Sequence, residues 1–209
     1  WRLLFDGRTT DGWRGAYRSS FPTQGWTVEN GELVLLSGGT GGHIVTDELY
    51  SAFELQLEFK LTPGANSGIM YFMSDRYAGS NNTAIGLEYQ LLDDESDVDF
   101  KRGVITANTL GSLYGLIPRI KMPTNVGLAP RVGEWQHARI VVHLDNRVEH
   151  WLNGVKVVEY VRGSPEYRRI VAQSSFNVLP NFGEDGRGRI LLQDRGQEVR
   201  FRSIKIRAL

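Results

Sequence analysis

Two polar side chains, Glu88 and Gln90, stand out in a strand-like run, Gly86 to Leu92, that is otherwise apolar. Because side chains alternate between the two faces of a β-strand, Glu88 and Gln90 share one face and Tyr89 with its leucine neighbours faces the other way. An ionised carboxylate without a partner is costly to bury. We therefore expect the face that carries Glu88 to be a polar groove.

Three further polar residues are candidates for the same groove. Gln193 and Arg195 share one face of a second strand-like run, and the planar guanidinium of Arg195 can pair with a carboxylate or with sugar oxygens. His43 follows the glycine loop Gly38 to Gly42, which could present its imidazole to a cleft. The alternatives are buried ion pairs that hold the sheet together and, for His43, an ordinary structural histidine. The whole set favours a ligand site.

Aromatic and amide side chains elsewhere suit a carbohydrate. The rings of Tyr71, Tyr114 and Trp151 could stack on the C–H faces of a pyranose. Asn66, in the turn-like run Asn66-Ser67-Gly68, could hydrogen-bond sugar hydroxyl groups. These residues predict a mono- or disaccharide, or a glycoside, as the ligand.

Other clusters do not support a metal ion or a cofactor. The glycine loop lacks the Gly-Lys-Ser/Thr ending and the following helix of a nucleotide-binding loop. The four histidines lack zinc-site spacing. The acidic run Asp93 to Asp99 lacks the central glycine and the final glutamate of a calcium loop. We interpret this run as a solvated acidic loop, with adventitious calcium as the alternative, and expect no cofactor.

The elements that position these side chains are mostly strands. Phe53 to Leu61 alternates apolar and polar side chains, which is typical of a half-buried antiparallel strand. Asn30-Gly31, Asp145-Asn146 and Asn153-Gly154 are hairpin turn signals between further strand-like runs. A parity shift between Phe201 and Ile204 predicts a β-bulge in the last strand.

Helical signals are few: Ser164-Pro165-Glu166 predicts the start of one short helix. About ten short strands with turns between them predict an all-β, two-sheet antiparallel sandwich. The 209 residues fit a single domain, 1–209, without an internal repeat or a linker.

Composition excludes several classes of protein. The absence of cysteine removes disulfide scaffolds and thiolate catalysis. Equal numbers of basic and acidic residues, 24 each, argue against a nucleic-acid partner. No apolar run approaches the roughly 20 residues that cross a bilayer. The pattern leaves the oligomeric state open.

A series of short motifs, in this order, resembles the 3-keto-disaccharide hydrolase family over nearly the full chain. The motifs are Leu4-Phe5-Asp6-Gly7, Gly25-Trp26-Thr27-Val28, Gly42-His43-Ile44-Val45-Thr46, Asn66-Ser67-Gly68-Ile69, Gly86-Leu87-Glu88-Tyr89-Gln90, Gly133-Glu134-Trp135, Trp151-Leu152-Asn153-Gly154 and Leu192-Gln193-Asp194. The resemblance implies a concanavalin A-like jelly roll with a concave groove. It also implies an exported, periplasmic or cell-surface protein of the kind common in Bacteroidetes, and a chain that opens at Trp1 without methionine agrees with a removed leader.

The resemblance implies cleavage of 3-keto-glycosides. A ketone at C3 acidifies the C2 proton; a base removes that proton, the C1 oxygen leaves, and water then adds. Such a site needs a base, a stabiliser for the enolate oxygen and an acid. The catalytic candidates are Glu88 as base, with His43 and Arg195, and the substrate-binding candidates are Asn66, Gln90, Tyr71, Tyr114, Trp151 and Gln193.

Three positions depart from the family pattern. Arg195 and Asp97 stand where histidine is common, and Gly115 stands where aspartate is common. If the replaced groups carry the acid-base chemistry, the chain would be a non-catalytic carbohydrate-binding or accessory module. Both interpretations remain open at the level of the sequence.

Overall fold

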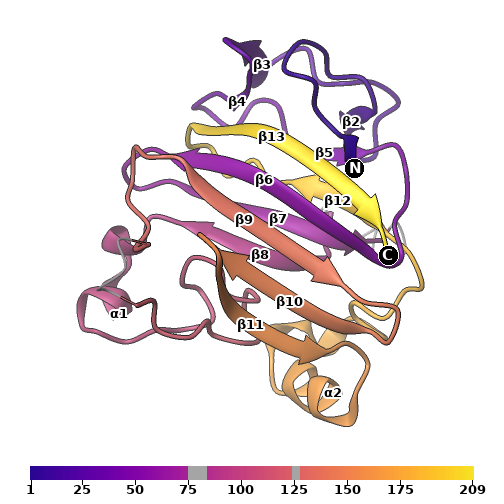
Figure 1. The fold of residues 1–209 in the computed structure, drawn as a ribbon, viewed down its shortest axis with the longest axis vertical. Helices are drawn as coiled ribbons and strands as arrows, with labels where there is room; N and C mark the ends of the chain where they lie inside the picture. The colour runs from indigo at the N-terminus through magenta and orange to yellow at the C-terminus, as the bar shows by residue number, and fades with distance from the viewer. Residues whose placement is uncertain (75–83, 124–127) are drawn as a thin grey trace.

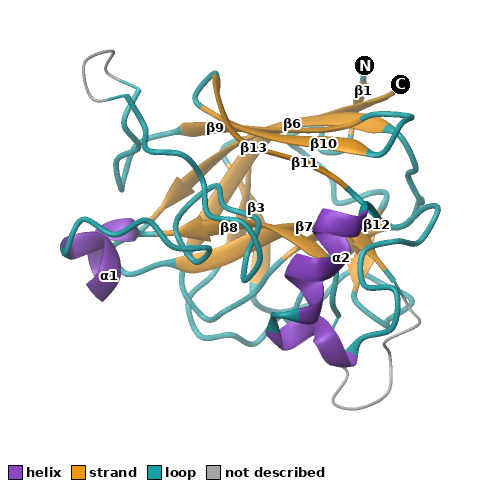
Figure 2. Ribbon diagram, turned by 90° about the horizontal axis from the view of Figure 1, so that it is seen from below, coloured by secondary structure: helices purple, strands orange, loops and turns teal. Residues whose placement is uncertain are grey.

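Two antiparallel β-sheets pack face to face (Figures 1 and 2). The structure, a computed structural model, describes residues 1–74, 84–123 and 128–209. One layer in Figure 2 contains β6, β9, β10, β11 and β13, and the other contains β7, β8 and β12. The two-sheet antiparallel sandwich that the strand pattern predicted is confirmed.

The larger sheet has eight strands in the order β11-β10-β9-β6-β13-β4-β3, and β1 pairs with β13 beside this path. Their bounds are β1 (Arg2–Leu3), β3 (Trp26–Glu29), β4 (Glu32–Leu35), β6 (Phe53–Leu61), β9 (Gln136–Val142), β10 (Arg147–Leu152), β11 (Val155–Val161) and β13 (Val199–Ala208). The nine-residue alternation over 53–61 is β6, the strand between β9 and β13.

The smaller sheet has five strands in the order β2-β5-β12-β7-β8. Their bounds are β2 (Trp13–Gly15), β5 (Ile44–Thr46), β7 (Asn66–Met73), β8 (Leu87–Leu92) and β12 (Arg189–Leu192). Short helical segments lie outside the sheets: η2 (Asp94–Ser96), α1 (Val98–Lys101), α2 (Pro165–Ala172) and η3 (Ser175–Val178). The predicted helix is α2; it begins at Pro165, after the N-cap Ser164, whose hydroxyl accepts the Tyr167 N–H.

The turn signals act as expected. Asn30 and Gly31 join β3 to β4, and both have positive φ, at 53° and 79°, the backbone that a tight two-residue hairpin requires. The predicted bulge lies in β13, where the pairing with β6 shifts between Arg202 and Lys205 and Ser203 has φ 54°.

One large hydrophobic cluster fills the space between the two sheets. β6 contributes its alternating apolar residues, such as Phe53 and Phe59, and the smaller sheet contributes Ile69 from β7 and Leu192 from β12. Each buried side chain of this size stabilises the fold by roughly 1.5–3 kcal/mol. The core fixes which residues of the smaller sheet face outward, because their neighbours in sequence face inward.

Candidate functional site

A row of polar positions crosses the outer face of the smaller sheet. Leu192 of β12 is paired with Ile44 of β5 on one side and with Ile69 of β7 on the other. All three face the core, so the adjacent residues face outward. The row therefore contains His43, just before β5, Gln193, just after β12, Gly68 of β7 and, paired with Gly68, Gln90 of β8. The Gln193 N–H donates to the Gly68 carbonyl at 3.0 Å.

Glu88 lies two residues before Gln90 on the same face of β8, and its side chain extends into the polar row. The backbone of Glu88 belongs to the next row across the sheet, which is otherwise apolar. In that row Glu88 of β8 pairs with Met70 of β7, Met70 pairs with Leu191 of β12, and Leu191 pairs with Val45 of β5. Its carboxyl group leans over Gly68, since a Cβ built on that glycine would lie 2.0 Å from Oε1 of Glu88. The missing side chain of Gly68 thus makes room for a carboxyl group among the polar positions.

Glu88 is 7% exposed. Burial raises the pKa of its carboxyl group to about 8, and the positive charge of Arg195 partly opposes that rise. Among the residues that the structure describes, no side chain or backbone group hydrogen-bonds the Glu88 carboxyl group. Beside it, the side-chain oxygen of Gln90 is buried and also has no partner in the described parts of the chain. The described residues therefore leave both buried groups without a hydrogen-bond partner.

The imidazole of His43 is held in one tautomer. The backbone N–H of Asp194 donates to Nδ1 of His43 at 3.0 Å, so Nδ1 has no proton and the neutral ring carries its proton on Nε2. Burial lowers the pKa of His43, the Asp194 carboxylate raises it, and Arg195 lowers it again. His43 is therefore a neutral hydrogen-bond donor through Nε2.

Asp194 also joins the two loops beside this row. Its Oδ2 accepts the Gly42 N–H at 3.0 Å and its Oδ1 accepts the Gly196 N–H at 2.9 Å. The carboxylate is thus occupied by backbone groups and fixes the glycine loop that precedes His43. Reasoning from the sequence missed this residue; a short acidic side chain two residues before a glycine is the available signal, because it is typical of a turn closed by its own carboxylate.

Asn66 and Arg195 lie together next to the polar row. Both line a shallow hollow with Asp194, Gly39 and Gly196. Arg195 is exposed at its rim. The effect of Arg195 on the pKa values of both Glu88 and His43 places its charge within electrostatic range of each.

Tyr114 lies beside Glu88 along the outer edge of β8. Its N–H donates to the Glu88 carbonyl at 3.0 Å. The same segment makes two more backbone hydrogen bonds to the edge, from Gln90 N–H to the Ser112 carbonyl and from Gly111 N–H to the Gln90 carbonyl. The structure thus gathers the predicted Glu88, His43, Arg195, Asn66, Gln90, Gln193 and Tyr114 on or beside one face of the sheet.

Tyr71 lies elsewhere, and its prediction as a sugar-stacking residue is wrong. The side chain is 0% exposed and points into the core, as Ile69 two residues earlier also does. Its hydroxyl group is 2.8 Å from Nε2 of His150 and 2.7 Å from the Tyr160 hydroxyl. A ring that is enclosed between the sheets cannot stack on a ligand at the outer face.

Trp151 also lies away from the polar row. It belongs to β10 of the larger sheet, and its buried neighbours His150 and Leu152 face the core, so Trp151 faces outward on the opposite side of the sandwich. Its Nε1–H donates to Glu149 at 2.7 Å, and the Arg139 guanidinium lies 4.9 Å from its ring centroid. The prediction that Trp151 shares a groove with Glu88 is therefore corrected.

Two of the positions that depart from the family pattern support local structure. Asp97 accepts the Phe100 N–H at 2.8 Å and caps α1. Gly115 has φ 69°, and a Cβ there would lie 3.0 Å from the Phe176 ring, so a larger residue would be strained and crowded. Of the three departures, Arg195 is the one beside the polar row.

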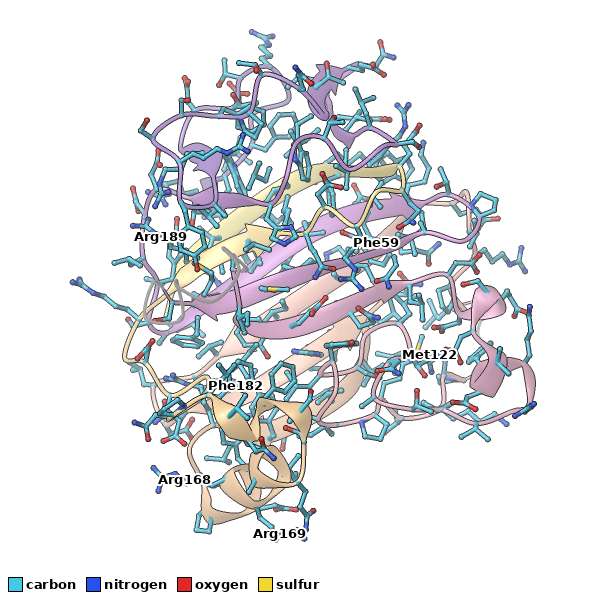
Figure 3. The ribbon with its side chains drawn as sticks, turned by 180° about the vertical axis from the view of Figure 1, so that it is seen from behind. Phe59, Met122, Arg168, Arg169, Phe182 and Arg189 are labelled. Carbon is cyan, nitrogen blue, oxygen red and sulfur yellow. The ribbon has the colours of Figure 1, made fainter. Side chains whose placement is uncertain are left out.

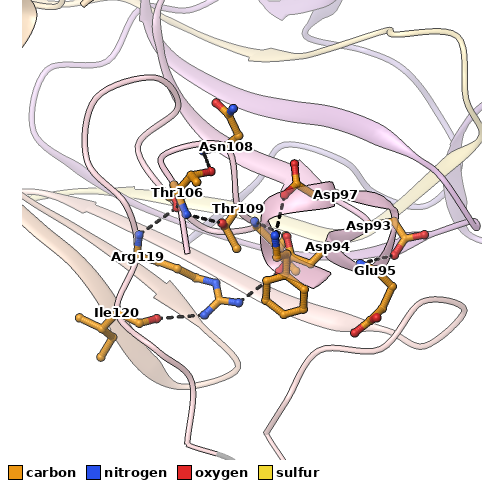
Figure 4. Close-up of polar contacts among 12 residues, drawn as sticks. Asp93, Asp94, Glu95, Asp97, Thr106, Asn108, Thr109, Arg119 and Ile120 are labelled. Atoms are coloured by element: carbon orange, nitrogen blue, oxygen red, sulfur yellow. Dashed lines mark hydrogen bonds and ion pairs between the residues drawn. The ribbon is translucent and has the colours of Figure 1, made fainter. Parts of the chain in front are cut away.

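The sequence predicted a solvated acidic loop, and Glu95 and Asp99 of this run are exposed, but Asp93 and Asp94 are not. Asp94 is buried, and its two oxygens accept the Leu110 N–H at 2.8 Å and the Arg119 guanidinium at 3.1 Å (Figure 4). Asp93 is buried as well and accepts the Gly64 N–H at 2.8 Å. Both carboxylates organise the backbone after β8, because each has partners that lie far along the chain.

Residues 1–74, 84–123 and 128–209 contain neither a cluster of metal ligands nor a helix that could span a membrane. No three histidine, aspartate or glutamate side chains in these ranges gather in a way that could hold a metal ion. No helix within them has the length and apolar character of a membrane span.

The full length of the chain matches a known family. The model of the 3-keto-alpha-glucoside-1,2-lyase-like domain matches residues 1–207. The chain belongs to this family. Over 99% of its length, the chain is 32% identical to a 3-keto-disaccharide hydrolase from Bacteroides thetaiotaomicron, of which the match covers 77%. The family resemblance inferred from the motifs is confirmed.

Solved structures share the fold of this 3-keto-alpha-glucoside-1,2-lyase-like domain. A candidate glycosyl hydrolase from Parabacteroides distasonis superimposes with a TM-score of 0.82 at 28% identity, covering 100% of this chain and 93% of the other. The carbohydrate-binding module CBM66 from Bacillus subtilis superimposes with a TM-score of 0.54 at 11% identity, covering 94% and 96%. The second likeness shows the fold alone, and it agrees with the predicted concanavalin A-like sandwich.

Proposed function

We propose that this protein cleaves 3-keto-glycosides by removing the proton on C2 of the oxidised sugar. The family and the related 3-keto-disaccharide hydrolase support this class of substrate. The observation that carries the proposal is the placement of the Glu88 carboxyl group over Gly68, whose neighbours across the sheet are Gln193 and Gln90, in the row that also contains His43.

The reaction proceeds in two stages. Glu88, in its ionised form, takes the C2 proton, and the electron pair of the C–H bond moves toward the C3 ketone to give an enolate. The enolate then reforms the ketone as the C1–O bond breaks, so that the leaving group departs as an alcohol once it is protonated. Water adds across the resulting enone and gives the free 3-keto sugar, so the net change is hydrolysis.

The other side chains bind and polarise the substrate. The Nε2–H of His43 and the guanidinium of Arg195 are donors suited to the developing negative charge on the C3 oxygen, because each is fixed or charged before the substrate arrives. The side-chain oxygen of Gln90, without a partner in the described residues, accepts a hydrogen bond from a sugar hydroxyl group. Asn66, Gln193 and Tyr114 complete the binding surface.

The arrangement differs from that of an ordinary glycosidase. Such enzymes use two carboxyl groups roughly 5–9.5 Å apart, one of them as acid. Here the other carboxylate next to the row, that of Asp194, is bonded to the Gly42 and Gly196 N–H groups and shapes the loops. A mechanism that needs one carboxylate base, with the His43 imidazole and the Arg195 guanidinium as hydrogen-bond donors, fits this set of groups better.

A pair of chromogenic substrates tests the proposal. We expect the protein to release nitrophenol from a 4-nitrophenyl 3-keto-glucoside and to leave the unoxidised 4-nitrophenyl glucoside intact, with both anomers assayed. Replacing the C2 hydrogen of the keto substrate by deuterium should slow the release. Glu88→Gln should abolish turnover, whereas Glu134→Gln, which changes an exposed carboxylate 3.8 Å from the Arg131 guanidinium, should retain it.

The alternative is a carbohydrate-binding module without catalytic activity, which the arginine at position 195 favours. In that case both variants and the wild-type chain would bind the 3-keto-glucoside in calorimetry, and none would release nitrophenol. Release from both the oxidised and the unoxidised glucoside would also contradict the proposal, because cleavage would then not depend on the C3 ketone.

The role of His43 has its own test. His43→Gln keeps an N–H donor at about the position of Nε2, whereas His43→Phe removes it. We expect the glutamine variant to retain more of kcat than the phenylalanine variant. Nitrogen NMR of the wild-type chain should show an unprotonated Nδ1 at neutral pH. A protonated Nδ1 would contradict the assigned tautomer.

A further inference from the structure

A second cavity lies at the α1 end of the sandwich, away from the polar row. Its volume is about 570 Å³, within the range of small-molecule sites. Apolar side chains from β6, α1, the segments 103–110, 121–123 and 128–132 and the core form most of its wall, among them Leu61, Phe100, Ile105, Leu110, Met122 and Val132. Figure 3 labels Met122 near α1. The wall contains none of the residues assigned to the polar row.

The charged groups in the wall are balanced. Arg119, 5% exposed, donates to Asp94 at 3.1 Å and to the Ile120 carbonyl at 2.9 Å, while Asp94 also accepts the Leu110 N–H (Figure 4). The remaining basic and acidic residues of the wall are equal in number, two of each. The charges of this buried pair offset each other, although Nε of Arg119 has no hydrogen-bond partner among the described residues. Asp93, which is buried as well, accepts the Gly64 and Glu95 N–H groups. The wall therefore has no net charge to offer an occupant.

We propose that this cavity binds an uncharged, mainly apolar ring compound. An anion or a cation would lose its hydration on entry without gaining a matching charge, whereas an apolar ring system would bury its surface against side chains such as Phe100 and Ile105. A drug-sized ligand fits the volume. The site is independent of the proposed cleavage reaction and needs no 3-keto sugar.

Two fluorescent probes with the same ring system test the site and its ligand class. N-phenyl-1-naphthylamine is uncharged, and its sulfonated relative, 1-anilinonaphthalene-8-sulfonate, is an anion. We expect the uncharged probe to bind the full chain saturably, with one site per chain, and at least tenfold more tightly than the anion. Tighter binding of the anion, or no saturable binding of the uncharged probe, would overturn the proposal.

A matched pair of variants locates the binding. Ile105 lines the cavity, whereas its neighbour Val104 is 50% exposed and does not. Ile105→Asp should weaken probe binding at least tenfold, and Val104→Asp should leave it unchanged. Val132→Trp fills the cavity without adding charge, and it should also weaken binding. Thermal melting of each variant serves as the control for folding. Unchanged binding in folded Ile105→Asp and Val132→Trp proteins would mean that the probe binds elsewhere, which refutes this site.

Discussion

The carboxyl group of Glu88 lies directly over Gly68 of the neighbouring strand, so that a Cβ on Gly68 would be 2.0 Å from Oε1. Heavy atoms that are not bonded do not approach so closely. Any side chain at position 68 would therefore push the carboxyl group out of the row that it shares with Gln90 and Gln193. Gly68 thus determines where the proposed base lies, although it has no functional group of its own.

Gly68→Ala should lower kcat on a 3-keto-glucoside. Displacing a catalytic group by about 1 Å can cost on the order of 100-fold in rate, and we expect a loss of this size. The control is Gly186→Ala, because a Cβ at Gly186 meets no atom within 4 Å. Steady-state kinetics on both variants, with melting temperatures, provide the measurement. A Gly68→Ala protein with wild-type kcat would show that the position of Glu88 does not matter.

The rate should depend on pH through Glu88. The pKa of this carboxyl group is about 8, and the proposed base acts only when ionised. We therefore expect kcat/KM to rise about tenfold per pH unit below pH 8 and to level off above it. The measurement is the pH profile of nitrophenol release. A profile that is flat from pH 6 to 9 would argue against Glu88 as the base.

Glu88→Gln should stabilise the protein at alkaline pH. The pKa of Glu88 is higher in the folded state than the ordinary value of 4.5, so the folded form holds a proton that the unfolded chain has released. Folding therefore loses stability as the pH rises from about 4.5 to about 8, and the loss is constant above that. The wild-type protein and Glu88→Gln should have similar melting temperatures at pH 4. At pH 9 the melting temperature of Glu88→Gln should be higher than that of the wild-type protein. Equal melting temperatures of the two proteins at pH 9 as well as at pH 4 would contradict this expectation.

Tyr71→Phe should reduce stability without changing substrate binding. Nδ1 of His150 donates to the Gly111 carbonyl at 3.0 Å, so Nε2 accepts from Tyr71, which in turn accepts from Tyr160. Removing the hydroxyl group leaves buried polar atoms without partners, at a cost of about 1–3 kcal/mol. Chemical denaturation measures this loss. A large increase in KM with unchanged stability would instead support a role in the substrate site.

The two sides of the sandwich should respond differently to loss of an aromatic ring. Trp151 lies on the outer face of the larger sheet, and Tyr114 lies beside Glu88. Trp151→Ala should therefore leave KM for the keto-glucoside unchanged, while Tyr114→Ala should raise it. Kinetics on the two variants make the comparison. The reverse result would place the substrate on the larger sheet.

Alternation along single strands was predictable from the sequence. Glu88 and Gln90 share the outward face of β8, as period two requires, because the intervening Tyr89 is apolar enough to mark the core side. β7 gave no such signal. Met70, Tyr71 and Phe72 are apolar on both faces, so the inward direction of Tyr71 became known only once its partners from β10 and β11 were placed.

Contacts between distant segments were beyond the sequence. Asp94 meets Arg119 across 25 positions, and Asp194 meets Gly42 across 152. Neither pair belongs to a periodic pattern, because each arises where loops from different strands meet at the end or edge of a sheet. Likewise, the hairpin signal at Asn153-Gly154 located β10 but could not assign Trp151 to a sheet.

The segment that runs along β8 from Gly111 to Tyr114 has a consequence for the behaviour of the protein at high concentration. An exposed edge strand is a template on which a second molecule can add its own strand, which leads to aggregation. The Glu88 carbonyl and both backbone groups of Gln90 are already hydrogen-bonded to this segment. The strand that carries the proposed base is thus closed to intermolecular pairing at these positions, and concentrated solutions should resist association through this edge.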